Sequence, residues 1–217
     1  MSKLGTQLII FNMPRWCTSG EYQVRRFNAS DESEEKSDLV LRWYRKKGSF
    51  RRVLALDTVN SLELVSKWYS PKITVSRADG EAVLYANWRV TKGSDTEIQV
   101  GRGSLLLQIS VDTDCRHYKV NKGGDKVATI DALEGCKSEK LRKTALSRGE
   151  AERDKIQWQV AVLTNVVTKD DPSWEDLAWM SSDPATVSLK LIAIVALIIA
   201  QQAPKIGVIE RPLIDLS

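Results

Sequence analysis

The densest group of chemically capable residues in this chain is a basic turn between positions 42 and 52. Six basic residues flank Phe50 there: Arg42, Arg45, Lys46, Lys47, Arg51 and Arg52. Such a group could hold a phosphoinositide head group or an anionic leaflet, since each basic side chain near a membrane contributes about 1 kcal/mol. The alternative is a solvated hairpin whose charges neutralise the acidic loop at residues 31–38. The sequence favours neither interpretation over the other.

His117 and Cys115 are the best candidates for nucleophilic chemistry. His117 is the sole histidine of the chain, and Cys115, two residues earlier, shares its face if the segment is a strand. A Cys–His pair could supply a nucleophile and its base, but no third group that would orient the histidine is evident. An active site needs several convergent titratable groups. We therefore expect these two side chains to be ordinary residues of one strand, and we do not expect the protein to be an enzyme.

Metal and cofactor sites are not expected. Asp112 and Asp114 lack the glycine and the distal glutamate of a calcium loop, so a solvated turn is the better interpretation. The three cysteines, Cys17, Cys115 and Cys136, show no Cys-x-x-Cys spacing. The run from Gly101 to Gly103 is too short to cradle a phosphate and indicates a turn.

Composition indicates a soluble globular protein. Of 217 residues 42% are hydrophobic and 28% charged, and the net charge of +4 is too small to imply nucleic acid without a localised patch. An odd number of widely spaced cysteines favours a reducing compartment. The apolar patch near the N-terminus is too short for a signal peptide. We therefore expect a cytoplasmic protein, with peripheral membrane attachment as an option.

Alternating and short apolar runs predict an antiparallel β protein. The clearest signal is a hairpin in which Asp79 and Gly80 join two β-rich runs, because glycine tolerates the positive φ of tight turns. Residues 62–68 fit a strand or a short helical turn. Further strands are expected at 4–11 (ended by Pro14), 39–44, 53–56, 96–100, 105–111, 117–120, 127–130 and 156–167.

Between the strands lie two segments of different character and several tryptophans. Residues 28–38 are polar and acidic and predict an exposed loop, and residues 134–155 predict a charged surface insertion.

Trp88 and Trp158 fall on apolar strand faces and are expected in the core. Trp174 and Trp179 precede the last helix, where they could form a binding rim, although packing is the favoured interpretation.

The last apolar run organises the fold. Asp183 is suited to cap a helix that begins at Pro184, and Gln202 followed by Pro204 predicts its end, giving a helix over 184–202. Residues 191–200 are apolar on every face but too few to cross a bilayer, so no transmembrane segment is expected. A sheet closed around this helix would bury it on all sides. We predict one domain over 1–217, mainly β: a closed antiparallel β-barrel of about 10–12 strands around a buried hydrophobic C-terminal helix.

This pattern resembles the superfamily of tubby C-terminal, LURP-one-related and phospholipid scramblase proteins. Many strands followed by the apolar run 187–199 look like its barrel and central helix, and the strand–Asp-Gly–strand unit ending in Tyr85 is similar to its repeated hairpins, as is the strand 116–120. The resemblance covers residues 39–202, with fungal members of no assigned activity nearest in style, and no run matches a scramblase calcium site. It implies a lipid- or phosphoinositide-contacting module, or a defence or stress protein, without known catalytic residues.

The expected function is therefore non-enzymatic: a module that binds membrane lipid, such as phosphoinositide, or a protein partner. The alternative is a nucleic-acid-binding or assembly protein that uses the same basic turn, with a steep salt dependence. A small-molecule carrier with its ligand between helix and barrel is disfavoured, because the apolar helix offers no polar group to orient a ligand.

Overall fold

The computed structural model describes residues 6–15, 18–27, 39–45, 52–55, 61–66, 72–77, 79–87, 96–100, 105–111, 117–132 and 156–209. Within these ranges the chain is mainly β, and all of its strand pairs are antiparallel, which confirms that part of the prediction. The strands are β1 (Thr6–Arg15), β2 (Thr18–Phe27), β3 (Leu39–Arg45), β4 (Arg52–Ala55), β5 (Ser61–Ser66), β6 (Lys72–Arg77), β7 (Ala82–Asn87), β8 (Thr96–Val100), β9 (Leu105–Val111), β10 (His117–Lys122), β11 (Asp125–Ala132) and β12 (Ile156–Val162).

The strands follow one another in space almost as they do in sequence. Each pairs with the strand before it and the strand after it along the chain, from β2 to β11. β1 pairs with β2 on one side and with β12 on the other, through partners such as Ile10 and Trp158. Every described strand therefore has hydrogen-bonded neighbours on both sides.

Two hairpins show how the sequence sets local geometry. At the β6–β7 turn, Gly80 has a φ of 88° and the backbone N–H of Arg77 donates to the carbonyl of Glu81 at 2.8 Å, as the Asp-Gly signal predicts. At the β10–β11 turn, Gly123 and Gly124 have φ values of 58° and 94°. Two successive positive φ angles are the requirement of a two-residue hairpin loop of type I′, and glycine meets it without steric cost.

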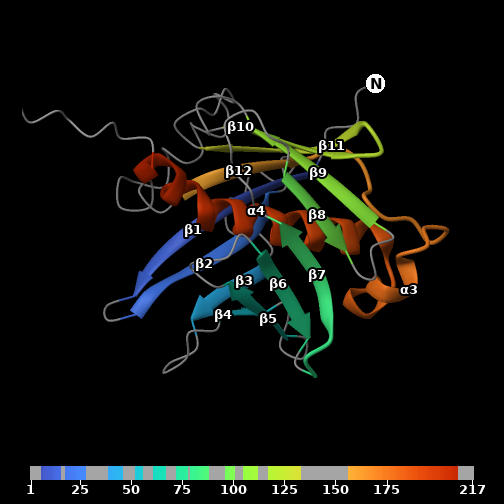
Figure 1. The fold of residues 1–217 in the computed structure, drawn as a ribbon, viewed down its shortest axis with the longest axis horizontal. Coiled ribbons are helices and arrows are strands. Elements are labelled where there is room, and N and C mark those ends of the chain that lie inside the picture. The colour runs from blue at the N-terminus through green and yellow to red at the C-terminus, as the bar shows by residue number, and fades with distance from the viewer. Residues whose placement is uncertain are drawn as a thin grey trace, which may run out of the picture.

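The helix α4 (Pro184–Ile209) follows the short α3 (Trp174–Leu177) and the 3-10 turn η2 (Ala178–Met180). It begins where predicted, and the carboxylate of Asp183 accepts hydrogen bonds from the backbone N–H and the hydroxyl of Thr186 at 3.0 and 2.7 Å. Every side chain at residues 191–200 is at most 2% exposed. Figure 1 shows α4 running through the middle of the molecule, with β9–β12 above it and β2–β7 below. The apolar run is therefore buried from all directions, as expected.

Three predicted boundaries are wrong for identifiable reasons. The helix does not end at residue 202 but continues past Pro204 to Ile209, because a proline removes one helical hydrogen bond without forcing an end. β1 continues past Pro14 to Arg15, and the register with β2 shifts there, since a bulge tolerates the missing N–H. β12 ends at Val162 and not at 167. The N–H of Leu163 still donates to the carbonyl of Val127, but the N–H groups of Val166 and Val167 bond to Ser188 and not to a strand.

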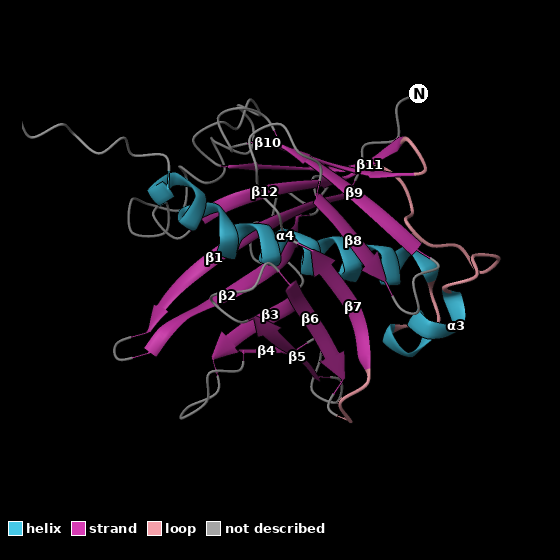
Figure 2. Cartoon of the chain, in the orientation of Figure 1, coloured by secondary structure: helices cyan, strands magenta, loops and turns pink. Residues whose placement is uncertain are grey.

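The remaining predicted segments divide between those that are described and those that are not. The ambiguous run near residue 62 is a strand, β5. The acidic loop 28–38 and the charged insertion 134–155 lie outside the described residues. No single helix in the described ranges is both long and apolar enough to span a membrane. The described loops gather with α3 at the end of the molecule where α4 begins (Figure 2).

Candidate functional site

Two arginines and one exposed leucine come together on the neighbouring strands β2 and β3. In the register of this pair, Gln23 lies opposite Arg42, and Arg25 lies opposite Leu39. The Nε–H of Arg25 donates to Oε1 of Gln23 at 3.1 Å, so Gln23 lies beside both arginines. We call Gln23, Arg25, Leu39 and Arg42 the basic face.

A β-bulge accounts for the exposure of the leucine. Val24 pairs with Leu41 but the next residue, Arg25, pairs with Leu39, so Val40 is the extra residue of the bulge. In a regular strand Leu39 would share the face of Leu41, which is buried at 1% exposure. Beyond the bulge Leu39 is 48% exposed. The bulge therefore holds an apolar side chain on the outside of the sheet, next to Arg25.

The predicted basic turn is only partly described. Arg42 is an exposed residue of β3. Arg45 and Arg52 lie opposite each other at the end of the β3–β4 ladder, and Lys46, Lys47 and Arg51 lie outside the described residues. Arg45 is three positions beyond Arg42, so the two positions fall on opposite faces of the sheet. Whether the six residues form one group stays a prediction.

The positive charge extends further along the sheet than the turn. β2, β3 and β4 together carry five arginines against one glutamate, a net charge of +4. The sequence analysis missed Arg25 and Arg26, because β2 has too weak an alternation to be predicted as a strand. The available signal was the Arg-Arg-Phe run that ends β2.

His117 has a partner that the sequence does not reveal. Its Nδ1 lies 2.6 Å from Oδ1 of Asp131, which is directly opposite on β11, and both side chains are about three-quarters buried. The aspartate can hold the imidazole in one orientation. Cys115, Asp112, Asp114 and the turn at 101–103 lie outside the described residues. Among the described residues, no group of three or more His, Cys, Asp or Glu side chains is arranged to hold a metal ion.

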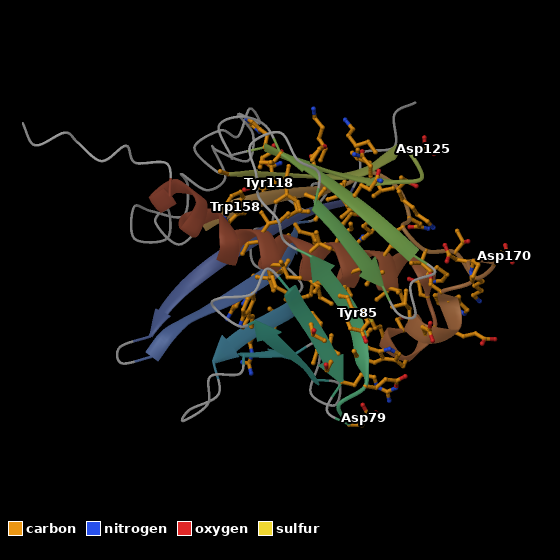
Figure 3. The ribbon with its side chains drawn as sticks, viewed as in Figure 1. Asp79, Tyr85, Tyr118, Asp125, Trp158 and Asp170 are labelled. Atoms are coloured by element: carbon orange, nitrogen blue, oxygen red, sulfur yellow. The ribbon has the colours of Figure 1, made fainter. Side chains whose placement is uncertain are left out.

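The tryptophans pack, where they are described. Trp158 is buried as predicted, and its ring meets Tyr118 edge-on with the centroids 5.9 Å apart (Figure 3). Trp174 and Trp179 are partly buried against the core, which is the favoured interpretation of the sequence analysis. Trp88 lies outside the described residues.

The segment 163–183 between β12 and α4 is fixed by polar contacts. Nζ of Lys122 donates to Oδ2 of Asp171 at 2.5 Å and to the carbonyl oxygen of Val166 at 2.7 Å. Burial of Asp171 opposes ionisation, but hydrogen bonds from Lys122 and Ser173 outweigh it and hold the pKa of the carboxyl below its usual value. Oγ of Ser188, in α4, accepts the N–H groups of Val166 and Val167 at 3.0 and 3.1 Å. These contacts anchor the segment to β10 and to α4.

No family model, curated protein or solved structure matches this chain. A function for it therefore rests on its own residues.

Proposed function

We propose that this chain is a non-enzymatic module that binds anionic membrane lipid, such as phosphoinositide, through the basic face. In this proposal its sheet is a closed barrel around α4, like that of the tubby-like superfamily, and it works at the cytoplasmic surface of a membrane. The ring of strand pairs and the complete burial of residues 191–200 support the barrel. The charge of β2–β4 supports the lipid.

The observation that carries the proposal is the exposed leucine beside the two arginines. A lipid surface offers phosphate groups to Arg25 and Arg42, at about 1 kcal/mol for each basic residue. It also offers an apolar boundary to Leu39, which gains from burial there. A nucleic acid would use the arginines alone, so the combination favours a membrane over a nucleic acid.

Co-sedimentation with liposomes tests this function. The probe is phosphatidylcholine vesicles with and without a few per cent of a phosphoinositide. We expect binding only to the phosphoinositide vesicles, weakened about 10- to 30-fold in the variant Arg25→Gln/Arg42→Gln. Adding Leu39→Ser to this double variant should weaken binding further, since it removes the apolar contact with the lipid. The matched control is Lys119→Gln/Lys126→Gln, which removes two exposed charges of β10 and β11.

Three outcomes would overturn the proposal, and one further variant shows how far the binding site extends along the chain. Failure of the wild type to pellet, or equal losses in the control variant, overturns it. Binding to an oligonucleotide with a steep salt dependence and no effect of Leu39→Ser would replace it with the nucleic-acid alternative. The variant Arg45→Ala/Lys46→Ala/Arg51→Ala/Arg52→Ala then shows whether the turn belongs to the same site.

A further inference from the structure

A half-open pocket of about 170 Å³ lies between α3 and the β6–β7 hairpin. Its apolar lining residues are Ala82 and Val83 of β7 and Trp179 of η2. The other lining residues are charged: Glu81, Glu175, Asp176 and Arg77. None of these residues belongs to the basic face, so this pocket is a second, separate feature of the surface.

The tryptophan of this pocket is held in place and already contacts a cation. Its Nε1–H donates to the backbone carbonyl of Asp176 at 2.9 Å, which fixes the plane of the indole. The guanidinium carbon of Arg77 lies 5.4 Å from the centroid of the ring. That is the distance of a cation–π contact, in which the negative face of the ring attracts a positive group. The contact between Arg77 and Trp179 is therefore one example of the cation–π interaction that this ring can make with an organic cation.

The carboxylates of the pocket outnumber its cation. Arg77 bonds to Glu81 at 3.1 Å and approaches Asp79 at 3.4 Å. The side chains of Glu175 and Asp176 form no hydrogen bond or ion pair with any other described residue, and Asp176 is partly buried. Three carboxylates and one guanidinium line the pocket, which gives it a local charge of −2 on a chain whose net charge is +4. An anion is repelled here and a second cation is attracted.

We propose that this pocket binds a guanidinium or ammonium group, presented by a protein partner as an arginine or lysine side chain. Ala82 and Val83 suit the aliphatic stem of such a side chain, and Trp179 suits its charged end. Glu175 and Asp176 supply oxygen acceptors for its N–H donors. A quaternary ammonium group, such as the choline of a lipid, has no N–H to offer them, so the acceptors favour the protein side chain.

The test uses the peptide acetyl-Gly-Gly-Arg-Gly-Gly-amide and the same peptide with citrulline in place of arginine. Binding is followed by the NMR shift of the indole N–H of Trp179, assigned with Trp179→Phe. We expect the arginine peptide to shift this resonance and the citrulline peptide to leave it in place. Glu175→Gln and Asp176→Asn each raise the Kd about two- to fivefold, since each removes one partly exposed charge pair.

The variant Arg77→Gln separates this proposal from a merely structural role. It frees the face of Trp179 and removes a competing charge, so the arginine peptide should bind about two- to fivefold more tightly. Loss of the structural contact alone would weaken binding or leave it unchanged, and either result overturns the proposal. The control Asp125→Asn, on the distant β10–β11 turn, should have no effect (Figure 3). An equal shift with phosphocholine would also overturn it, in favour of a lipid head group.

Discussion

Helix α4 and the segment before it are neighbours in the chain, but the segment adds polar bonds to the burial that stabilises the helix. Residues 191–200 are almost completely buried, and all of them are apolar. The segment 163–183 also buries apolar side chains, such as Val166 and Leu177. It has in addition a few directional bonds to the elements around it, from Lys122 to Asp171 and from Val166 and Val167 to Ser188. The helix is stabilised by area removed from water, which has no direction. The directional bonds of the segment depend on geometry, and a single substitution that removes one partner breaks them.

The largest effect should come from a cavity in α4. Leu197 is 1% exposed, and Leu197→Ala should lower the free energy of unfolding by about 2–5 kcal/mol, because the core closes only partly around the space left. Leu197→Met keeps most of the volume and should cost less than about 1.5 kcal/mol. Urea unfolding followed by tryptophan fluorescence measures both.

Leu163→Ala provides the control for this prediction. Leu163 is 43% exposed, so its loss should change stability by no more than about 0.5 kcal/mol. Equal losses at Leu163 and Leu197 would contradict the burial of α4 inside the sheet.

The next largest effect should come from the serine that joins the two regions. Ser188 is 1% exposed, and Ser188→Ala leaves the buried N–H groups of Val166 and Val167 without their acceptor. The expected loss is about 1–3 kcal/mol. Amide hydrogen exchange should quicken at these two residues before it does in α4. Ser110→Ala, at a half-buried position of β9, is the control and should leave their exchange unchanged.

A pH-dependent effect should follow from Asp171. Since its pKa is lowered in the folded state, it stabilises the fold above its usual pKa, and this contribution is lost as the pH falls below about 4. Asp171→Asn should therefore cost about 1–3 kcal/mol at pH 7 and progressively less at acid pH. Urea unfolding at pH 7 and pH 3 measures the difference. The control is the exposed neighbour Asp170, whose change to Asn should alter stability at pH 7 by no more than about 0.5 kcal/mol.

The smallest effect should come from the cap of α4. Asp183→Ala removes the acceptor for Thr186, and we expect Tm to fall by about 2–4 °C. Asp183→Asn keeps a side-chain oxygen that can cap the helix, so it should retain most of the stability. A thermal scan that shows no difference between the two variants would mean that burial alone sets the start of this helix.

The elements that the sequence predicts are those whose signals are local. Asp183 and Pro184 mark the start of α4 within two residues, and the turn at Gly80 needs only its own flanking runs. The end of α4 is not predicted by its local sequence, because a proline removes one helical hydrogen bond and does not specify where the helix ends. β2 has no clean alternation, so its pairing with β1 and β3 decides its conformation.

The candidate sites depend on register, which the sequence does not carry locally. His117 meets Asp131 because the β10–β11 turn places them opposite each other. Leu39 faces outward because Val40 adds one residue to β3, and an apolar residue before an apolar run gives no hint of this. The pocket near Trp179 joins α3 to the β6–β7 hairpin, which are about 100 residues apart in the chain.

The pairing of β1 with β12 has a consequence for synthesis. At about 5–20 residues per second on the ribosome, Ile10 waits roughly 7–30 s for its partner Trp158 to be made, and α4 is made later still. Throughout that interval one edge of β1 is open to strands of other chains. The nascent protein therefore remains prone to aggregation until the last quarter of its chain is made and β12 covers this edge. Truncated products that lack β12 should be the species that chaperones bind.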